Sequence, residues 1–142
     1  IDLLKDVAPN HVNQIKELVR EGFYDGVPFH RVIPGFMAQT GDGQFGNGTG
    51  GSSKPDLMQE FNNTSHLRGT VSMARTQDPN SANSQFFICF GPTSHLDGQY
   101  TVFGQVVSGM EHVDNIKVGA GSSGEVADPD LMISVKVLSD IQ

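Results

Sequence analysis

The sequence predicts a mainly β protein, an antiparallel sheet closed into a barrel with two flanking α-helices. Short apolar runs with the composition of strands recur through both halves of the chain. Apolar residues recur at helical spacing in only two segments, which is too few helices to cover both faces of a parallel sheet. The length of 142 residues suits a single core, so we expect one domain over residues 1–142.

The first half of the chain predicts a strand, a helix and two further strands. Residues 1–4 form the first expected strand. Residues 8–22 predict a helix, because apolar residues recur every three or four positions and Asn10 can cap the first turn. The runs "PFHRVI" and "FMAQTG" predict short strands on either side of a Pro-Gly hinge.

The second half predicts a long loop followed by strands. Residues 41–68 show no sustained period and are rich in Gly, Ser and Asn, and a loop of this length in a small domain usually has a function. We then expect strands at 69–74, 84–90 and 100–107, a short helix at 109–117 and a half-buried strand at 133–137.

The composition argues against several classes of partner. Sixteen acidic and nine basic side chains give a net charge of −7 without a Lys/Arg cluster, so we expect no nucleic-acid binding. No apolar run approaches the roughly 20 residues that a bilayer crossing needs, so we expect no membrane partner. The lone Cys89 lies in an apolar run and favours a reducing compartment. We expect a cytoplasmic protein, or a periplasmic one if a signal peptide preceded Ile1.

Glycines at positions 41, 43 and 46 match the fingerprint of a dinucleotide-binding loop. That fingerprint needs a helix that opens at the third glycine, because the helix N-terminus donates to the pyrophosphate. The letters that follow, "NGTGGSSKP", cannot begin such a helix, and repeated βαβ units are absent. We therefore interpret the segment as a turn-forming loop and expect no cofactor. A nucleotide-dependent oxidoreductase is kept only as the third functional hypothesis.

Two other chemistries fit the sequence poorly. The run "TSHLD" places Ser94, His95 and Asp97 together, but neighbours in an extended chain point to opposite faces and could not easily share a proton. The five histidines are scattered, without helical pairs or cysteine partners at zinc spacing. We expect neither a hydrolase triad nor a dedicated metal site.

The segment "FHRVIPGFMAQTGD" interleaves polar and large apolar side chains. On an alternating strand Arg31 shares a face with Phe29 and Ile33. Such an arginine is either an exposed side chain over apolar neighbours or a cation held beside an apolar pocket, and the residue type alone favours exposure. By the same reasoning Phe36 and Met37, taken alone, are typical of a core.

That segment, together with "GTVSMA", "NSANSQFFICF" and "LDGQYTVFGQVVSGME", strongly resembles the cyclophilin family of peptidyl-prolyl cis/trans isomerases. The blocks follow in one order from about Val7 to Val118, and they look closest to compact bacterial single-domain members. The resemblance implies an eight-stranded antiparallel barrel with two helices. The family's first strand begins upstream of "IDLL", so we expect a missing or truncated first strand with an exposed edge.

The resemblance also implies an active site. Arg31 would be the catalytic arginine, with Phe36 and Gln39 beside it in the groove. Nine further residues would bind substrate: Met37 with Phe87, Leu96 and Tyr100 around the proline, His95 where many members carry tryptophan, Ala74 and Arg75 along the substrate backbone, and Ala82 and Asn83 near the pocket for residues before proline.

Two positions depart from the common family pattern. Tryptophan is common where this chain has His95, and histidine where it has Tyr100. Because the tryptophan helps to bind cyclosporin, we expect this drug to bind weakly, if at all. The resemblance implies proline-containing peptides and unfolded protein clients as partners, and we expect a monomer.

The residue types suit the reaction that the resemblance implies. Amide resonance sets a rotation barrier of ~18–20 kcal/mol. The proline nitrogen recovers its lone pair only in the twisted transition state, where a fixed donor such as Arg31 would be favoured. We therefore expect an isomerase that assists protein folding. A module that binds proline peptides without turnover is the second hypothesis.

Overall fold

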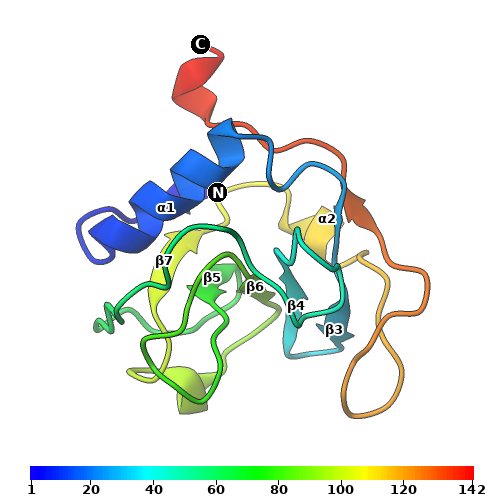
Figure 1. The fold of residues 1–142 in the computed structure, drawn as a ribbon. Coiled ribbons are helices and arrows are strands. Elements are labelled where there is room, and N and C mark those ends of the chain that lie inside the picture. The colour runs from blue at the N-terminus through cyan, green and yellow to red at the C-terminus, as the bar shows by residue number, and fades with distance from the viewer.

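The computed structural model describes residues 1–142 and confirms a mainly β fold with two α-helices (Figure 1). The helices are α1 (Pro9–Arg20) and α2 (Met110–Val113), with 3₁₀ turns η1 (Ser94–Leu96) and η2 (Leu138–Asp140). The strands are β1 (Asp2–Leu3), β2 (Val27–Pro28), β3 (Arg31–Ile33), β4 (Met37–Thr40), β5 (Thr70–Met73), β6 (Phe86–Cys89), β7 (Val102–Gln105) and β8 (Leu131–Met132).

Six strands form one antiparallel sheet in the order β1-β7-β5-β6-β4-β3, and β2 pairs separately with β8. The paired strands thus form a six-stranded sheet and a separate strand pair. Single backbone hydrogen bonds join β3 to the segment that follows α2. Val32 donates to the carbonyl of Gly124 across 2.8 Å, and Gly119 donates to the carbonyl of Val32 across 2.9 Å.

Strand β1 is a short edge strand with β7 as its single neighbour in the sheet. Asp2 pairs with Gln105, and Leu3 pairs with Gly104. Residues 1–4 were expected to form the whole strand, and only the middle two do so. Leu4 still donates its amide to the carbonyl of Phe103, which holds the chain against β7 as it leaves the sheet.

The start of α1 corrects one prediction, because Asn10 does not cap the helix. Ala8 occupies the N-cap position without a side-chain cap, and Pro9 follows it. The carboxylate of Glu60, which lies in the long loop, accepts hydrogen bonds from the amides of Asn10 and His11. A negative charge at this end also suits the helix dipole. Glu60, which is distant in sequence, therefore caps the start of α1, the role that the local pattern predicted for Asn10.

The C-terminal predictions need two corrections. Helix α2 ends at Val113 rather than at residue 117. The expected strand at 133–137 is absent, and β8 lies just before it. Val135 and Val137 are partly buried as expected, whereas Ile133 is 88% exposed. Val135 packs against the main core, while its amide donates to the Asp25 carboxylate rather than to a neighbouring strand.

The main core lies between α1 and the sheet, and α1 crosses over the sheet (Figure 1). Burying each large aliphatic side chain there contributes about 1.5–3 kcal/mol. Helix α1 supplies the apolar stripe that the sequence predicts, made of Val12, Ile15, Leu18 and Val19. A separate, smaller apolar cluster lies on the face of the sheet that points away from α1, and it forms the floor of the candidate site. It consists of Met37, Phe87, Cys89 and Leu96. Neither helix is long and apolar enough to span a bilayer.

Candidate active site

The hairpin of β3 and β4 places Arg31 directly opposite Gln39. Gly35 makes the turn between the strands with a left-handed φ of 74°, which a glycine adopts without strain. Side chains opposite each other in an antiparallel pair project to the same face. The Arg31 guanidinium consequently donates from Nη1 to Gln39 Oε1 across 3.1 Å.

The charge of Arg31 is held in place but not neutralised by a carboxylate. Its Nε donates to the carbonyl of Ser123 across 2.9 Å, and no acidic side chain lies within ion-pair distance. The side chain is partly exposed. Of the two interpretations left open for this arginine, the structure favours a cation held beside an apolar hollow.

A pocket of about 150 Å³ opens beside Arg31, which is about ten times the space that one water needs. We call it the proline pocket, after the ligand that the family resemblance implies for these residues. Its floor is apolar and well packed, because Met37 and Phe87 are almost fully buried. Nine residues line it: Arg31, Phe36, Met37, Gln39, Ala74, Arg75, Phe87, Leu96 and Tyr100. All nine belong to the set that the sequence singled out.

Arg75 and Tyr100 form one rim of the proline pocket. The Arg75 guanidinium lies 4.5 Å above the Tyr100 ring, and it donates to the carbonyl of Gln99 from two nitrogens. The Tyr100 ring in turn meets Phe87 edge to face, with centroids 5.9 Å apart. Stacking a cation on a ring is worth ~0.5–1 kcal/mol at an exposed site, so Arg75 helps to hold this rim.

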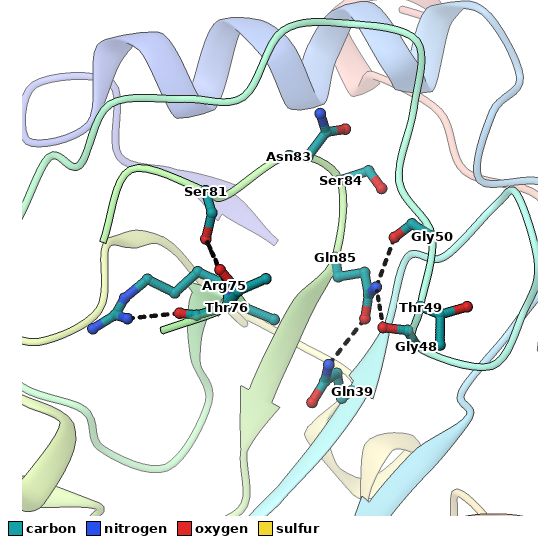
Figure 2. Close-up of a pocket in the computed structure, with 11 residues that line it drawn as sticks. Gln39, Gly48, Thr49, Gly50, Arg75, Thr76, Ser81, Asn83, Ser84 and Gln85 are labelled. Atoms are coloured by element: carbon teal, nitrogen blue, oxygen red, sulfur yellow. Dashed lines mark hydrogen bonds between the residues drawn. The ribbon is translucent and has the colours of Figure 1, made fainter. Parts of the chain in front are cut away.

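A second pocket of similar volume adjoins the first, and its lining residues are polar side chains and glycines apart from one alanine (Figure 2). We call it the polar pocket. Gln39, Ala74 and Arg75 line both pockets, so the two form one continuous groove. The other lining residues are Gly48, Thr49, Gly50, Thr76, Ser81, Asn83, Ser84 and Gln85.

Three predicted substrate-binding residues lie outside the proline pocket. Asn83 lines the polar pocket, where its side chain oxygen accepts hydrogen bonds from Ser52. His95 lies beyond Phe36, with ring centroids 5.7 Å apart, and lines neither pocket. Ala82 also lines neither pocket, because it is buried in the main core and its backbone pairs with Leu57.

The glycine-rich loop encloses a carboxylate that belongs to the chain itself. Asp42 is 1% exposed and accepts hydrogen bonds from five backbone amides that follow it in sequence. The donors are Gln44, Phe45, Asn47, Gly48 and Gly50, at 2.9–3.2 Å. Burial opposes ionisation here, yet these amides outweigh it and lower the pKa of Asp42 to about 2. The spacing of the glycines matches that of a phosphate-binding loop. The anion that this loop encloses, however, is the carboxylate of Asp42.

A chain of polar side chains lies behind the proline pocket, with His66 and Ser72 buried and Asp97 partly exposed. Asp97 accepts from the backbone amide of His66 and from its Nδ1, and these bonds lower the pKa of the Asp97 carboxyl. His66 Nε2 lies 2.9 Å from the hydroxyl of Ser72. Ser72 is fully buried, so its hydroxyl cannot meet a substrate as a nucleophile would. The His66 ring stacks on Phe87 and supports the pocket wall from behind.

Gln85 is the main groove residue that sequence reasoning missed. Its side chain bonds to Gln39 and to two carbonyls of the glycine-rich loop. A signal for it was present, because residues two apart on a strand share a face and Gln85 precedes Phe87 by two. No group of three or more His, Cys, Asp or Glu side chains is arranged to hold a metal ion.

The chain is similar to a known protein family and to several of its members. The family model described as cyclophilin type peptidyl-prolyl cis-trans isomerase/CLD matches residues 1–137. A probable peptidyl-prolyl cis-trans isomerase of Brucella suis is 57% identical, over 99% of this chain and 77% of the relative. A peptidyl-prolyl cis-trans isomerase of Synechococcus elongatus is 44% identical, over 94% of this chain and 84% of the relative.

Two solved structures resemble the fold closely. A cyclophilin from Hirschia baltica superposes with a TM-score of 0.85 at 29% identity, over 97% of this chain and 69% of that one. A Cryptosporidium parvum cyclophilin type peptidyl-prolyl cis-trans isomerase, crystallised in the presence of the dipeptide Ala-Pro, gives a TM-score of 0.84 at 28% identity. That match covers 94% of this chain and 87% of the other.

Proposed function

Since the chain belongs to the cyclophilin-type peptidyl-prolyl cis-trans isomerases and is an enzyme of that class, we propose how its residues catalyse rotation about X–Pro bonds. The proline ring occupies the proline pocket against Phe36, Met37, Phe87 and Leu96. The residues before proline run along Ala74 towards the polar pocket. Arg31 stands at the wall of the proline pocket, near the nitrogen of the bond that turns.

Arg31 acts on a charge distribution that exists only during rotation. In the planar ground state the proline nitrogen shares its lone pair with the carbonyl and accepts no hydrogen bond. As the bond twists, the nitrogen becomes pyramidal and regains that pair. A donor placed beside it therefore stabilises the transition state far more than the bound substrate, which lowers the barrier.

The surroundings of Arg31 strengthen this contact. The apolar floor of the proline pocket excludes water, and a charge acts more strongly where water is absent. Two fixed acceptors, Gln39 Oε1 and the Ser123 carbonyl, hold the guanidinium in one orientation before substrate arrives. The remaining N–H groups of Arg31 are then free to face the substrate.

One observation carries the proposal, namely a guanidinium without a carboxylate partner at the wall of an apolar pocket. NMR on a single proline-containing peptide tests it, because line broadening measures affinity and exchange spectroscopy measures cis/trans turnover. The parent protein is expected to do both. Saturable binding without accelerated exchange would instead describe a module that captures proline peptides.

The same groove suggests the partners. We infer that substrates are proline-containing peptides and unfolded protein clients, and that neither nucleic acid nor a membrane is a partner. The Cryptosporidium relative, crystallised in the presence of Ala-Pro, supports this substrate class. Cyclosporin is proposed to bind weakly, because His95 stands outside the pocket beside Phe36. We also propose a cytoplasmic monomer, with the periplasm as the alternative location, and a barrel completed by the backbone bonds beside β3.

A further inference from the structure

Gln85 lies just before β6, between the glycine-rich loop and Gln39 (Figure 2). Its Nε2 donates to the carbonyls of Gly48 and Gly50, across 3.0 and 2.8 Å. An amide nitrogen carries two hydrogens, so both are used by the loop. The Gln85 oxygen is thereby turned away from the loop and towards Gln39.

The orientation of Gln85 decides the orientation of Gln39. Gln39 Nε2 donates to Gln85 Oε1 across 3.0 Å, which leaves Gln39 Oε1 to accept from Arg31. A half-turn of the Gln39 amide would bring its oxygen against the oxygen of Gln85 and its NH₂ group against the guanidinium. Because a guanidinium can only donate, this reversed arrangement has no favourable pairing.

The bonds therefore run in one direction, from Arg31 to Gln39, then to Gln85 and on to the loop carbonyls. Hydrogen bonds aligned in this way polarise one another and strengthen the chain. We call this series the amide relay. It supplies one of the two hydrogen bonds that hold the Arg31 guanidinium, and the Ser123 carbonyl accepts the other.

The loop end of the amide relay is itself anchored. Gly48 and Gly50 accept from Gln85 through their carbonyls, and both donate their amides to Asp42 Oδ2, across 2.9 and 3.0 Å. The two acceptors of Gln85 are consequently fixed by the carboxylate at the centre of the loop. The glycine-rich loop thus serves as the fixed support of the relay.

We propose that Gln85 is a positioning residue of this isomerase, which orients Gln39 and, through it, the guanidinium of Arg31. The inference rests on the proposed role of Arg31 at the reacting nitrogen. Gln85 itself does not touch that nitrogen, since Gln39 stands between it and Arg31. Its contribution should therefore appear mainly in turnover.

The first test measures kcat and KM of Gln85→Leu by NMR exchange on one proline peptide. We expect kcat to fall about tenfold, with a smaller change in KM, because misplacing a catalytic donor costs rate more than binding. Gln44→Leu is the matched control, since Gln44 is an exposed glutamine of the same loop outside the relay, and it should keep parental kcat. A folded Gln85→Leu protein with parental kcat overturns the proposal.

A double-mutant comparison separates relay from general loop damage. In a Gln39→Leu background the relay is already broken, so Gln85→Leu should reduce kcat no further. The same fold-loss in both backgrounds would mean that Gln85 acts independently of Gln39, which refutes the inference. Arg31→Ala is measured in the same assay. Parental turnover of Arg31→Ala would contradict the proposed function. Loss of turnover in Arg31→Ala together with parental turnover in Gln85→Leu would contradict the amide relay alone.

Gln85→Glu provides a readout that survives if the leucine variant does not fold. Glutamate keeps the acceptor for Gln39 but loses both donors to the loop until it is protonated, when it regains one. We expect its kcat relative to the parent to rise as pH is lowered, and a pH-independent ratio contradicts the relay. The charged or titratable side chains nearby are those of Arg31, Arg75, Asp42 and His30, which packs against Gly48.

Discussion

The amide of Gly50 donates to the carboxylate of Asp42 across 3.0 Å, and a Cβ added at Gly50 would lie 2.5 Å from the other carboxylate oxygen. The loop therefore closes around Asp42 at a distance that only glycine permits at this position. The glycines allow the loop backbone to approach the Asp42 carboxylate closely. The glycine fingerprint in the sequence is instead typical of a loop that binds the phosphates of a ligand.

The close approach at Gly50 predicts a steric cost for alanine. Gly50→Ala should destabilise the protein by about 1–3 kcal/mol, because the loop must move away from Asp42 to admit the methyl group. Urea unfolding of the variant and parent measures the difference. Gly91→Ala is the control, since a Cβ there meets nothing within 4 Å. Equal effects of the two substitutions would show that the loop yields freely.

The Asp42 carboxylate predicts a defined loss of stability in acid. Its pKa is about 2 in the folded protein against an ordinary value of 3.8, so the unfolded chain binds the proton first as pH falls. The stabilisation, about 2 kcal/mol from this difference, is complete above pH ~5 and is lost between roughly pH 4 and pH 2.

Comparing Asp42→Asn with the parent isolates this contribution. The variant should be less stable at neutral pH, because an amide nitrogen would face backbone donors, and the gap should narrow as pH falls towards 2. Asp128→Asn is a suitable control, since the Asp128 side chain is 98% exposed. An unchanged gap across the acid range would mean that Asp42 is not the titrating group. Equilibrium unfolding at several pH values provides the measurement.

Local sequence patterns were sufficient for the elements whose contacts are local. The helical stripe of α1 and the β3-β4 hairpin around Pro34 and Gly35 follow from spacing and turn chemistry within a few residues. The hairpin register then brings Arg31 and Gln39 together without further information. The proline pocket itself came from the family resemblance, because its walls derive from four separate blocks of sequence.

The interactions that the sequence did not reveal join residues distant in the chain. Glu60 meets the start of α1 from 49 residues beyond His11, so the local capping pattern at Asn10 misled. Asp97 bonds to His66, 31 residues earlier, rather than to its neighbour His95. The packing of the whole sheet determines which of these distant residues meet. Hydrophobic periodicity describes only residues close in sequence, so it does not predict such pairs.

The stacking of His66 on Phe87 predicts a coupled loss of stability and turnover. His66→Leu removes the side-chain hydrogen bonds to Asp97 and Ser72, which should cost about 1–3 kcal/mol. The Ser72 hydroxyl keeps its bond to the Thr101 carbonyl, and Asp97 keeps the amide of residue 66, so the variant should still fold. The Phe87 wall loses its support, so kcat/KM should fall by a few fold, on the order of 1 kcal/mol.

Thermal unfolding and the exchange assay measure both effects of His66→Leu. His112→Leu serves as control, because the His112 side chain on α2 is 82% exposed and remote from the chain of contacts behind the pocket. Parental turnover in a destabilised but folded His66→Leu protein would limit His66 to a structural role. Parental stability would contradict the proposed polar chain itself.

The guanidinium of Arg31 predicts the largest effect on catalysis. Arg31→Ala should lower kcat/KM by about 10²–10³, the usual cost of one well-placed transition-state donor, while leaving the fold intact because the side chain is partly exposed. Arg31→Lys should recover little, since a lysine lacks the planar fork that bonds Gln39 and Ser123 while facing the substrate. Arg20→Ala, which removes an exposed pair with Asp140, is the control for charge alone. Protease-free NMR exchange measures the turnover of all three variants. Parental rates in Arg31→Lys would show that a positive charge alone suffices and that the fixed geometry of the guanidinium does not matter.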